Sequence, residues 1–199
     1  MDKKTDILFL DIDSVLNCSE FAQTVYEWQT NDKAFIEPNV PLVEKNVARL
    51  QCILSALPGL KIVWCTDWRL HLNEMYECWK NPRIWLENQH WMKDRIIGNT
   101  PKRFTSTHPQ EIHLWFKQNE FNKKHKTCSW MKDKHYDVGS YAILDDWDDS
   151  LMRKFGSHLF LTNPDHGLTA EIADKLISDM KEGRCKYSKE ELDWRRYED

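Results

Sequence analysis

The chain has 199 residues, 41% of them hydrophobic and 30% charged, which allows a folded core and excludes general disorder. Its length is that of one domain, with or without a small appendage. The formal net charge of −4 argues against a protein that binds nucleic acid through bulk positive charge, although a local basic groove remains compatible with it.

No apolar run reaches about 18 residues, the length that a membrane-spanning helix needs. The apolar stretch before Asp11 is too short for the core of a signal peptide. The six cysteines form no Cys-x-x-Cys pair and have no regular spacing, which favours reduced thiols over a disulfide framework or a zinc site. We therefore expect a cytoplasmic protein with no transmembrane segment, and delivery into another cell as an effector is also compatible with the sequence.

Short apolar runs and helical patterns alternate along the chain. The apolar runs predict buried strands at 7–10, 61–66, 96–99, 141–144 and 159–161. Apolar residues at helical spacing predict helices at about 41–57, 69–80, 109–119 and 169–181. Strands without internal alternation that are separated by helices are typical of a parallel sheet covered on both faces. We expect an α/β fold, a Rossmann-like core with a mainly parallel sheet.

Two further segments bear on the domain organisation. The stretch 122–137 is rich in Lys and His and predicts a long exposed loop. Ser188 followed by Glu191 has the spacing of a capping box, which predicts a short C-terminal helix. We expect one domain at 1–182 and a C-terminal helical extension at 183–199 that could lead into a further region.

Polar side chains stand where three of the predicted strands end. Asp11 and Asp13 follow the first strand, Thr66 and Asp67 end the second, and Asp145 and Asp146 follow the fourth. Ligands of an open parallel sheet bind beyond the carboxyl ends of its strands, so these groups converge if the strands are neighbours. Several carboxylates cannot stay ionised at close range without a cation, because like charges raise each other's pKa. A hard divalent ion with oxygen ligands, above all Mg²⁺, satisfies such a cluster.

The ordered motifs around these residues resemble those of the haloacid dehalogenase (HAD) superfamily. They are ILFLDIDSVLN at 7–17, KIVWCTDWR at 61–69 and YAILDDWDD at 141–149. Three shorter signatures are similar to a subgroup, the HAD domains of "Swiss Army Knife" RNA-repair proteins: GNTP at 98–101, Glu111-Ile112 with Trp115, and Gly167-Leu168-Thr169. The resemblance runs in order from about residue 6 to residue 180.

The resemblance implies a phosphatase that works through an aspartyl-phosphate intermediate. Asp11 would be the nucleophile. Asp13 would protonate the leaving oxygen and later activate water. Thr66 would hydrogen-bond the transferring phosphoryl group, although its hydroxyl could equally cap the following helix.

The resemblance also implies a metal site and a substrate-binding rim. Asp146, assisted by Asp145 or Asp149, would hold Mg²⁺ together with Asp11 and the backbone carbonyl of Asp13. The residues expected to contact phosphate or substrate are Ser14, Asp67 and Arg69, of which Arg69 is also interpreted as an ion-pair partner near the site. We interpret Asp148 as a bystander of the acidic motif.

Two positions depart from the family pattern. Ser14 stands where the family usually has glycine, which predicts a tighter or differently packed turn after Asp13. The family's basic residue has no obvious counterpart: the subgroup's Arg aligns with His108, and we favour Lys102 for the role. His71, His90, His108 and His113 have scattered spacings and are interpreted as core or surface residues rather than ligands.

The gaps between the motifs predict a minimal cap and therefore an open site. An open site suits a phosphorylated macromolecule, and the acidic balance favours a phosphoprotein, including one phosphorylated on tyrosine, over nucleic acid. The subgroup resemblance supports the alternative, a nucleic-acid end phosphatase or nucleotidase. A catalytically inactive HAD fold that serves as a binding module is the third hypothesis, motivated by Ser14 and the missing basic residue. The sequence makes no prediction of the oligomeric state.

Overall fold

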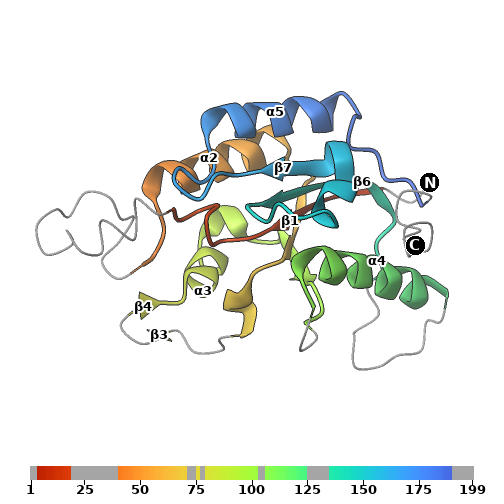
Figure 1. The fold of residues 1–199 in the computed structure, drawn as a ribbon, viewed down its shortest axis with the longest axis horizontal. Helices are drawn as coiled ribbons and strands as arrows, with labels where there is room; N and C mark the ends of the chain where they lie inside the picture. The colour runs from red at the N-terminus through yellow and green to blue at the C-terminus, as the bar shows by residue number, and fades with distance from the viewer. Residues whose placement is uncertain are drawn as a thin grey trace, which may run out of the picture.

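A five-stranded parallel sheet forms the centre of the molecule (Figure 1). The structure is a computed structural model and describes residues 4–18, 40–70, 75–76, 79–102, 106–124 and 135–189. In spatial order the strands are β5 (Ile96–Asn99), β2 (Lys61–Trp64), β1 (Thr5–Leu10), β6 (Val138–Asp145) and β7 (Leu159–Leu161). Every neighbouring pair is parallel, which confirms the α/β class and the five strands predicted from the sequence.

The central position of β1 brings the strand ends of the three motifs together. Leu10 lies opposite Trp64 in β2 on one side and opposite Leu144 in β6 on the other. The next residues along these three strands therefore emerge side by side at the carboxyl edge of the sheet. The first condition for a shared site, that the three strands are neighbours, is thus met.

Both faces of β1 are buried, which explains why its sequence does not alternate. On one face Leu8 and Leu10 pack into a core shared with α2 (Glu44–Ala56) and α5 (Ala170–Lys181), which lie together above the sheet in Figure 1. On the other face Ile7 and Phe9 pack against Ile112, Trp115 and Phe116 of α4 (His108–Lys124). The helices predicted at 41–57, 109–119 and 169–181 are confirmed by α2, α4 and α5.

The helix predicted at 69–80 is wrong. A short 3-10 helix, η1 (Asp67–Leu70), is followed by two antiparallel strands, β3 (Met75–Tyr76) and β4 (Trp79–Lys80). Their register places Tyr76 opposite Trp79, and aromatic residue types favour strands over helices. The short helix α3 (Pro82–Glu87) follows, and Asn81 caps it by accepting the N–H groups of residues 83 and 84.

Several predictions concern segments beyond the described residues. The cap depends on 19–39 and 71–74, and the C-terminal helix on 190–199, so both stay predictions, as does the domain division. The exposed loop predicted at 122–137 begins later, because α4 continues to Lys124, and 125–134 lie outside the described part. Among the helices of the described residues, none is long and apolar enough to cross a membrane.

Candidate active site

The backbone ladder of the sheet extends past the strand ends and fixes Asp11. The N–H of Asp11 donates to the carbonyl of Leu144 at 3.1 Å, and the N–H of Cys65 donates to the carbonyl of Leu10 at 2.9 Å. The Asp11 carboxylate is buried, and its Oδ1 accepts the N–H of Ile12 at 2.6 Å. Asp11 is therefore held rigidly at the centre of the carboxyl edge.

Asp13 is exposed at the start of the turn that follows. Its Oδ1 accepts hydrogen bonds from Nδ2 of Asn17 at 2.8 Å and from Nε1 of Trp68 at 3.0 Å. Asn17 in turn accepts the N–H of Ser14 at 2.6 Å through its Oδ1. The side chain that the sequence assigns to proton transfer is thus both accessible and oriented.

Ser14 adopts a left-handed backbone conformation, with φ of 57°. This is a region that glycine enters freely and other residues enter at a cost of about 1–2 kcal/mol. The Ser14 side chain hydrogen-bonds Asp146, a contact that glycine could not make. The departure from the family pattern therefore leaves a left-handed turn in place and adds a link between the first and the acidic motif.

Three carboxylates converge beyond β1 and β6. Oxygens of Asp11, Asp145 and Asp146 all lie within 4.8 Å of one another. Burial, reinforced by the charge of Asp145, raises the pKa of Asp11 well above its usual range. Burial also raises the pKa of Asp146, against the effect of its hydrogen bond with Ser14. Acidic groups crowded in this way fit a divalent cation with oxygen ligands such as Mg²⁺.

The other two aspartates of the acidic motif have structural partners. Asp149 accepts the N–H of Met152, the first residue of the 3-10 helix η3 (Met152–His158), at 2.6 Å, and it also accepts Nε1 of Trp147 at 2.8 Å. Asp148 is paired with Arg153 at the surface. Asp149, which the sequence offered as a metal ligand, does not belong to the group of three carboxylates, and its ligand role stays a prediction.

His108, the first residue of α4, lies directly against the acidic cluster. Its Nδ1 donates to Oδ2 of Asp145 at 2.8 Å and is 3.8 Å from Oδ2 of Asp11. Burial lowers the pKa of His108, but the hydrogen bond and the charges of both aspartates outweigh it and raise the pKa to about 9. The interpretation of His108 as a core or surface residue missed this position, although its alignment with the subgroup's basic residue was a signal.

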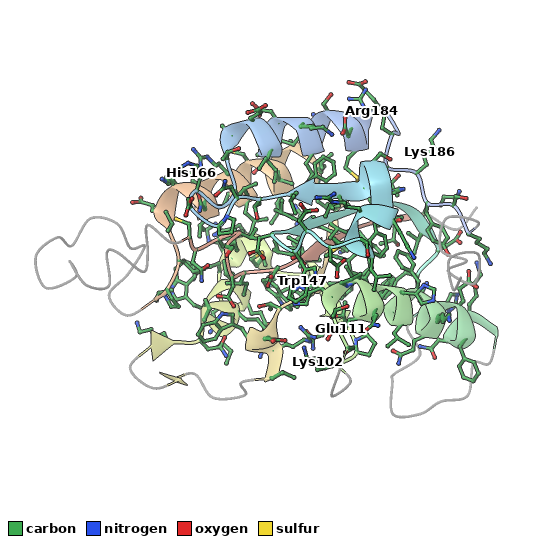
Figure 2. All side chains as sticks on the ribbon, in the orientation of Figure 1. Lys102, Glu111, Trp147, His166, Arg184 and Lys186 are labelled. Atoms are coloured by element: carbon green, nitrogen blue, oxygen red, sulfur yellow. The ribbon has the colours of Figure 1, made fainter. Side chains whose placement is uncertain are left out.

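Lys102 lies at the rim and is shared by two carboxylates. Its Nζ is 2.9 Å from Oδ1 of Asp67 and 3.2 Å from Oε1 of Glu111. Figure 2 shows Lys102, Glu111 and Trp147 gathered where α4 begins. Although partial burial lowers the pKa of Lys102, its hydrogen bonds with these two carboxylates raise it overall. The structure thus brings two of the predicted residues, Lys102 and Asp67, into one ion-pair group.

Arg69 and Thr66 are both buried near this group. Arg69 forms a buried ion pair with Glu111 and also donates to the backbone carbonyl of Thr66. Thr66 accepts the N–H of Trp68 through its hydroxyl at 3.4 Å, which is the helix-capping arrangement at the start of η1. The structure contains the ion pair that we interpreted for Arg69. The phosphate contacts of Thr66 and Arg69 stay predictions.

An exposed indole flanks the cluster. Trp147 is 42% exposed, and its ring centre is 5.8 Å from that of His108 at a tilt of 42°. Its backbone N–H donates to Oδ1 of Asp145 at 2.8 Å, and its ring nitrogen is held by Asp149. The ring is therefore held in place beside the carboxylates while one part of it faces solvent.

This fold and this cluster are those of a HAD-type hydrolase: a parallel sheet with Asp11 directly after its central strand, and Asp145 and Asp146 at the end of the neighbouring strand. The chain belongs to the family described as the HAD domain in Swiss Army Knife RNA repair proteins, whose model matches residues 7–173. Searches of curated proteins and of solved structures find no match to it. Family membership supports hydrolase chemistry of the HAD phosphatase type.

Proposed function

We propose that the protein is a Mg²⁺-dependent hydrolase of phosphomonoesters that works through an aspartyl-phosphate at Asp11. The observation that carries the proposal is the convergence of Asp11, Asp145 and Asp146 within 4.8 Å at the carboxyl edge of the sheet. When bound, Mg²⁺ would be held by these carboxylates and would neutralise charge on the transferring phosphoryl group.

Asp11 acts as the nucleophile in this proposal. Its Oδ1 is fixed by the N–H of Ile12, which sets the orientation of the whole carboxylate. Burial favours the neutral acid, so the attacking group needs positive charge nearby to remain ionised. His108 supplies such charge at 3.8 Å from Oδ2 of Asp11. The positive charge of His108 thus compensates for part of the free-energy cost of burying the ionised Asp11 carboxylate.

Asp13 acts first as the general acid and then as the general base in this proposal. Asn17 and Trp68 both donate to its Oδ1, so its orientation toward the turn is fixed while the side chain remains accessible to solvent. A carboxylic acid in that position can protonate the leaving oxygen and, once deprotonated, accept a proton from the attacking water. These two steps regenerate Asp11 and release inorganic phosphate.

The remaining predicted residues would bind the phosphoryl group or the substrate. Thr66, Ser14 and Asp67 would contribute hydrogen bonds, and Lys102 and Arg69 would contribute charge. Their present partners limit these roles, because Arg69 is paired with Glu111 and Lys102 is shared between two carboxylates. We therefore propose that His108 supplies the positive charge closest to the Asp11 nucleophile.

The test is phosphate release from an aryl phosphate with Mg²⁺ and with EDTA, in the wild type and in Asp11→Asn. We expect EDTA to abolish turnover and Asp11→Asn to lower the rate by more than about a thousandfold, because the nucleophile is lost. Asp148→Asn is the matched control, since Asp148 is exposed and forms a surface ion pair with Arg153. Unchanged turnover in Asp11→Asn would contradict the mechanism, and no turnover in the wild type would favour the inactive binding module.

For the substrate we propose a phosphorylated macromolecule, with a phosphoprotein first. The acidic net charge supports a protein substrate, and the exposed ring of Trp147 beside the cluster could pack against the ring of a phosphotyrosine. The second candidate is a nucleic-acid end, which the description of the family supports. Phosphate release from a phosphotyrosine peptide and from end-phosphorylated oligonucleotides, compared over a salt series, separates the two, since only oligonucleotide binding should weaken steeply with salt.

A further inference from the structure

A second set of metal-ligating atoms lies beside the three carboxylates. The Sγ of Cys65, a ring nitrogen of His108 and a carboxylate oxygen of Asp145 all lie within 4.8 Å of one another. Cys65 follows β2, His108 begins α4, and Asp145 ends β6, so three separate elements contribute. Cys65 is fully buried and has no part in the phosphoryl chemistry described above.

The donor types of this set differ from those of the carboxylate cluster. Sulfur, imidazole nitrogen and a single carboxylate oxygen are ligands of Zn²⁺ and similar transition metals, whereas Mg²⁺ prefers oxygen alone. A thiolate and a carboxylate together carry two negative charges and balance one divalent cation. Three protein ligands leave the fourth position of a tetrahedral ion for water or another small ligand.

We propose that Cys65, His108 and Asp145 form a Zn²⁺ site that shares Asp145 with the Mg²⁺ site and excludes Mg²⁺ when it is filled. Binding forms one Zn–S, one Zn–N and one Zn–O bond, and it releases to solvent the protons that Cys65 and His108 carry in the metal-free protein. No oxidation or reduction takes part. Zn²⁺ would thus act as an inhibitor that competes with the activating ion.

The surrounding structure holds the three ligands in position. The N–H of Cys65 donates to Leu10 and fixes the residue to the central strand. The buried ion pair between Arg69 and Glu111 ties the first turn of α4, and with it His108, to η1, the 3-10 helix that follows β2. His108 and Asp145 are already 2.8 Å apart, and the three ligand atoms lie within 4.8 Å of one another, close to the separations found around an ion with bonds of about 2.0–2.3 Å.

Co²⁺ titration of the full chain with reduced thiols tests the site directly, because a cobalt–thiolate bond gives a near-ultraviolet charge-transfer band. We expect one equivalent of Co²⁺ to produce the band in the wild type and Zn²⁺ to remove it. Cys65→Ala should lack the band and bind Zn²⁺ more than about tenfold more weakly, since a ligand is lost. Cys52→Ala, which changes an exposed cysteine on α2, should keep the band.

A band that persists in Cys65→Ala, or no band in the wild type, would overturn the proposal. Circular dichroism checks that Cys65→Ala is folded, and Cys65→Ser, which restores the volume but not the thiolate, should also lack the band. The test of inhibition rests on the proposed function. The Mg²⁺-dependent phosphatase rate of each variant is measured at increasing Zn²⁺ concentration. In the wild type, raising the Mg²⁺ concentration should relieve the inhibition. A band without phosphatase activity refutes the proposed function alone, and activity without a band refutes the zinc site alone.

Discussion

His108 supplies positive charge at the point where two buried aspartates meet. The groups that act on it are Asp145 at hydrogen-bond distance, Asp11 at 3.8 Å and, further off, Glu111. Burial alone would make the imidazole neutral, yet these carboxylates raise its pKa to about 9. The positive charge of His108 therefore balances part of the negative charge of the acidic cluster.

This arrangement predicts how stability depends on pH in the metal-free protein. The unfolded chain titrates His108 near its ordinary pKa of about 6.5, and the folded chain near 9. A raised folded pKa contributes stability that is complete below about 6.5 and is lost as pH rises to 9, on the order of 2–3 kcal/mol. Urea unfolding in EDTA across this range, compared with His108→Gln, measures it.

In His108→Gln the same loss should be absent, because the amide does not titrate. A wild-type stability that stays level relative to this variant between pH 6.5 and pH 9 would show that the folded pKa of His108 is not raised.

Among single residues, the sequence predicts the strand-end carboxylates but not the partners that they and their neighbours find in the fold. The strand-end carboxylates could be predicted, because position along a parallel strand decides which edge a side chain reaches. The ion-pair partner of Arg69 and Lys102 could not be predicted, because Glu111 comes from a different element and local sequence spacing does not indicate a buried ion pair. His108 was passed over for the same reason, since its charge matters only through neighbours that are distant in sequence.

At the scale of elements, the turn after β1 is clamped by the segment that follows β7. The hydroxyl of Thr162 donates to the carbonyl of Ser14 at 2.9 Å, and the N–H of Leu168 donates to the carbonyl of Val15 at 2.8 Å. Gly167 lies between these contacts with φ of +62°. The segment thus supports the turn that carries Asp13.

Gly167→Ala should destabilise the protein by about 2–4 kcal/mol. The added Cβ would lie 2.4 Å from Nδ2 of Asn46 and 2.6 Å from the carbonyl of Val15, in a backbone conformation that alanine rarely adopts. Urea unfolding midpoints measure the change. Gly59→Ala is the control, because a Cβ there meets nothing within 4 Å, and it should shift stability by less than about 0.5 kcal/mol. Equal stability of the two variants would show that Gly167 is not a point of close contact.

The hairpin of β3 and β4 shows how an element prediction fails. Apolar residues between 69 and 80 can be read at helical spacing, but Tyr76 and Trp79 lie opposite each other in the register of two antiparallel strands. Cross-strand pairing prevails over periodicity when the run is this short. The long helices α2 and α5 were predictable because their apolar faces extend over three turns and bury against one sheet face.

At the scale of the whole molecule, the class of sheet could be predicted from the sequence, and the second metal-ligand set could not. Polar residues at three strand ends form one site only if those strands are neighbours, and the structure meets this condition by placing β1 between β2 and β6. Cys65 and His108 are unremarkable in sequence, and the argument from cysteine spacing pointed away from zinc. They meet only because α4 packs beside the end of β2, an event that depends on the entire fold.

If Asp11 carries the phosphoryl group during turnover, as we propose, the aspartyl-phosphate can be trapped chemically. The wild type is quenched with borohydride during turnover of an aryl phosphate, and the peptide containing residue 11 is analysed by mass spectrometry. Borohydride reduces an acyl phosphate to an alcohol, so we expect homoserine at position 11 when substrate and Mg²⁺ are both present. Unmodified Asp11 during active turnover, or modification of another aspartate, would contradict it.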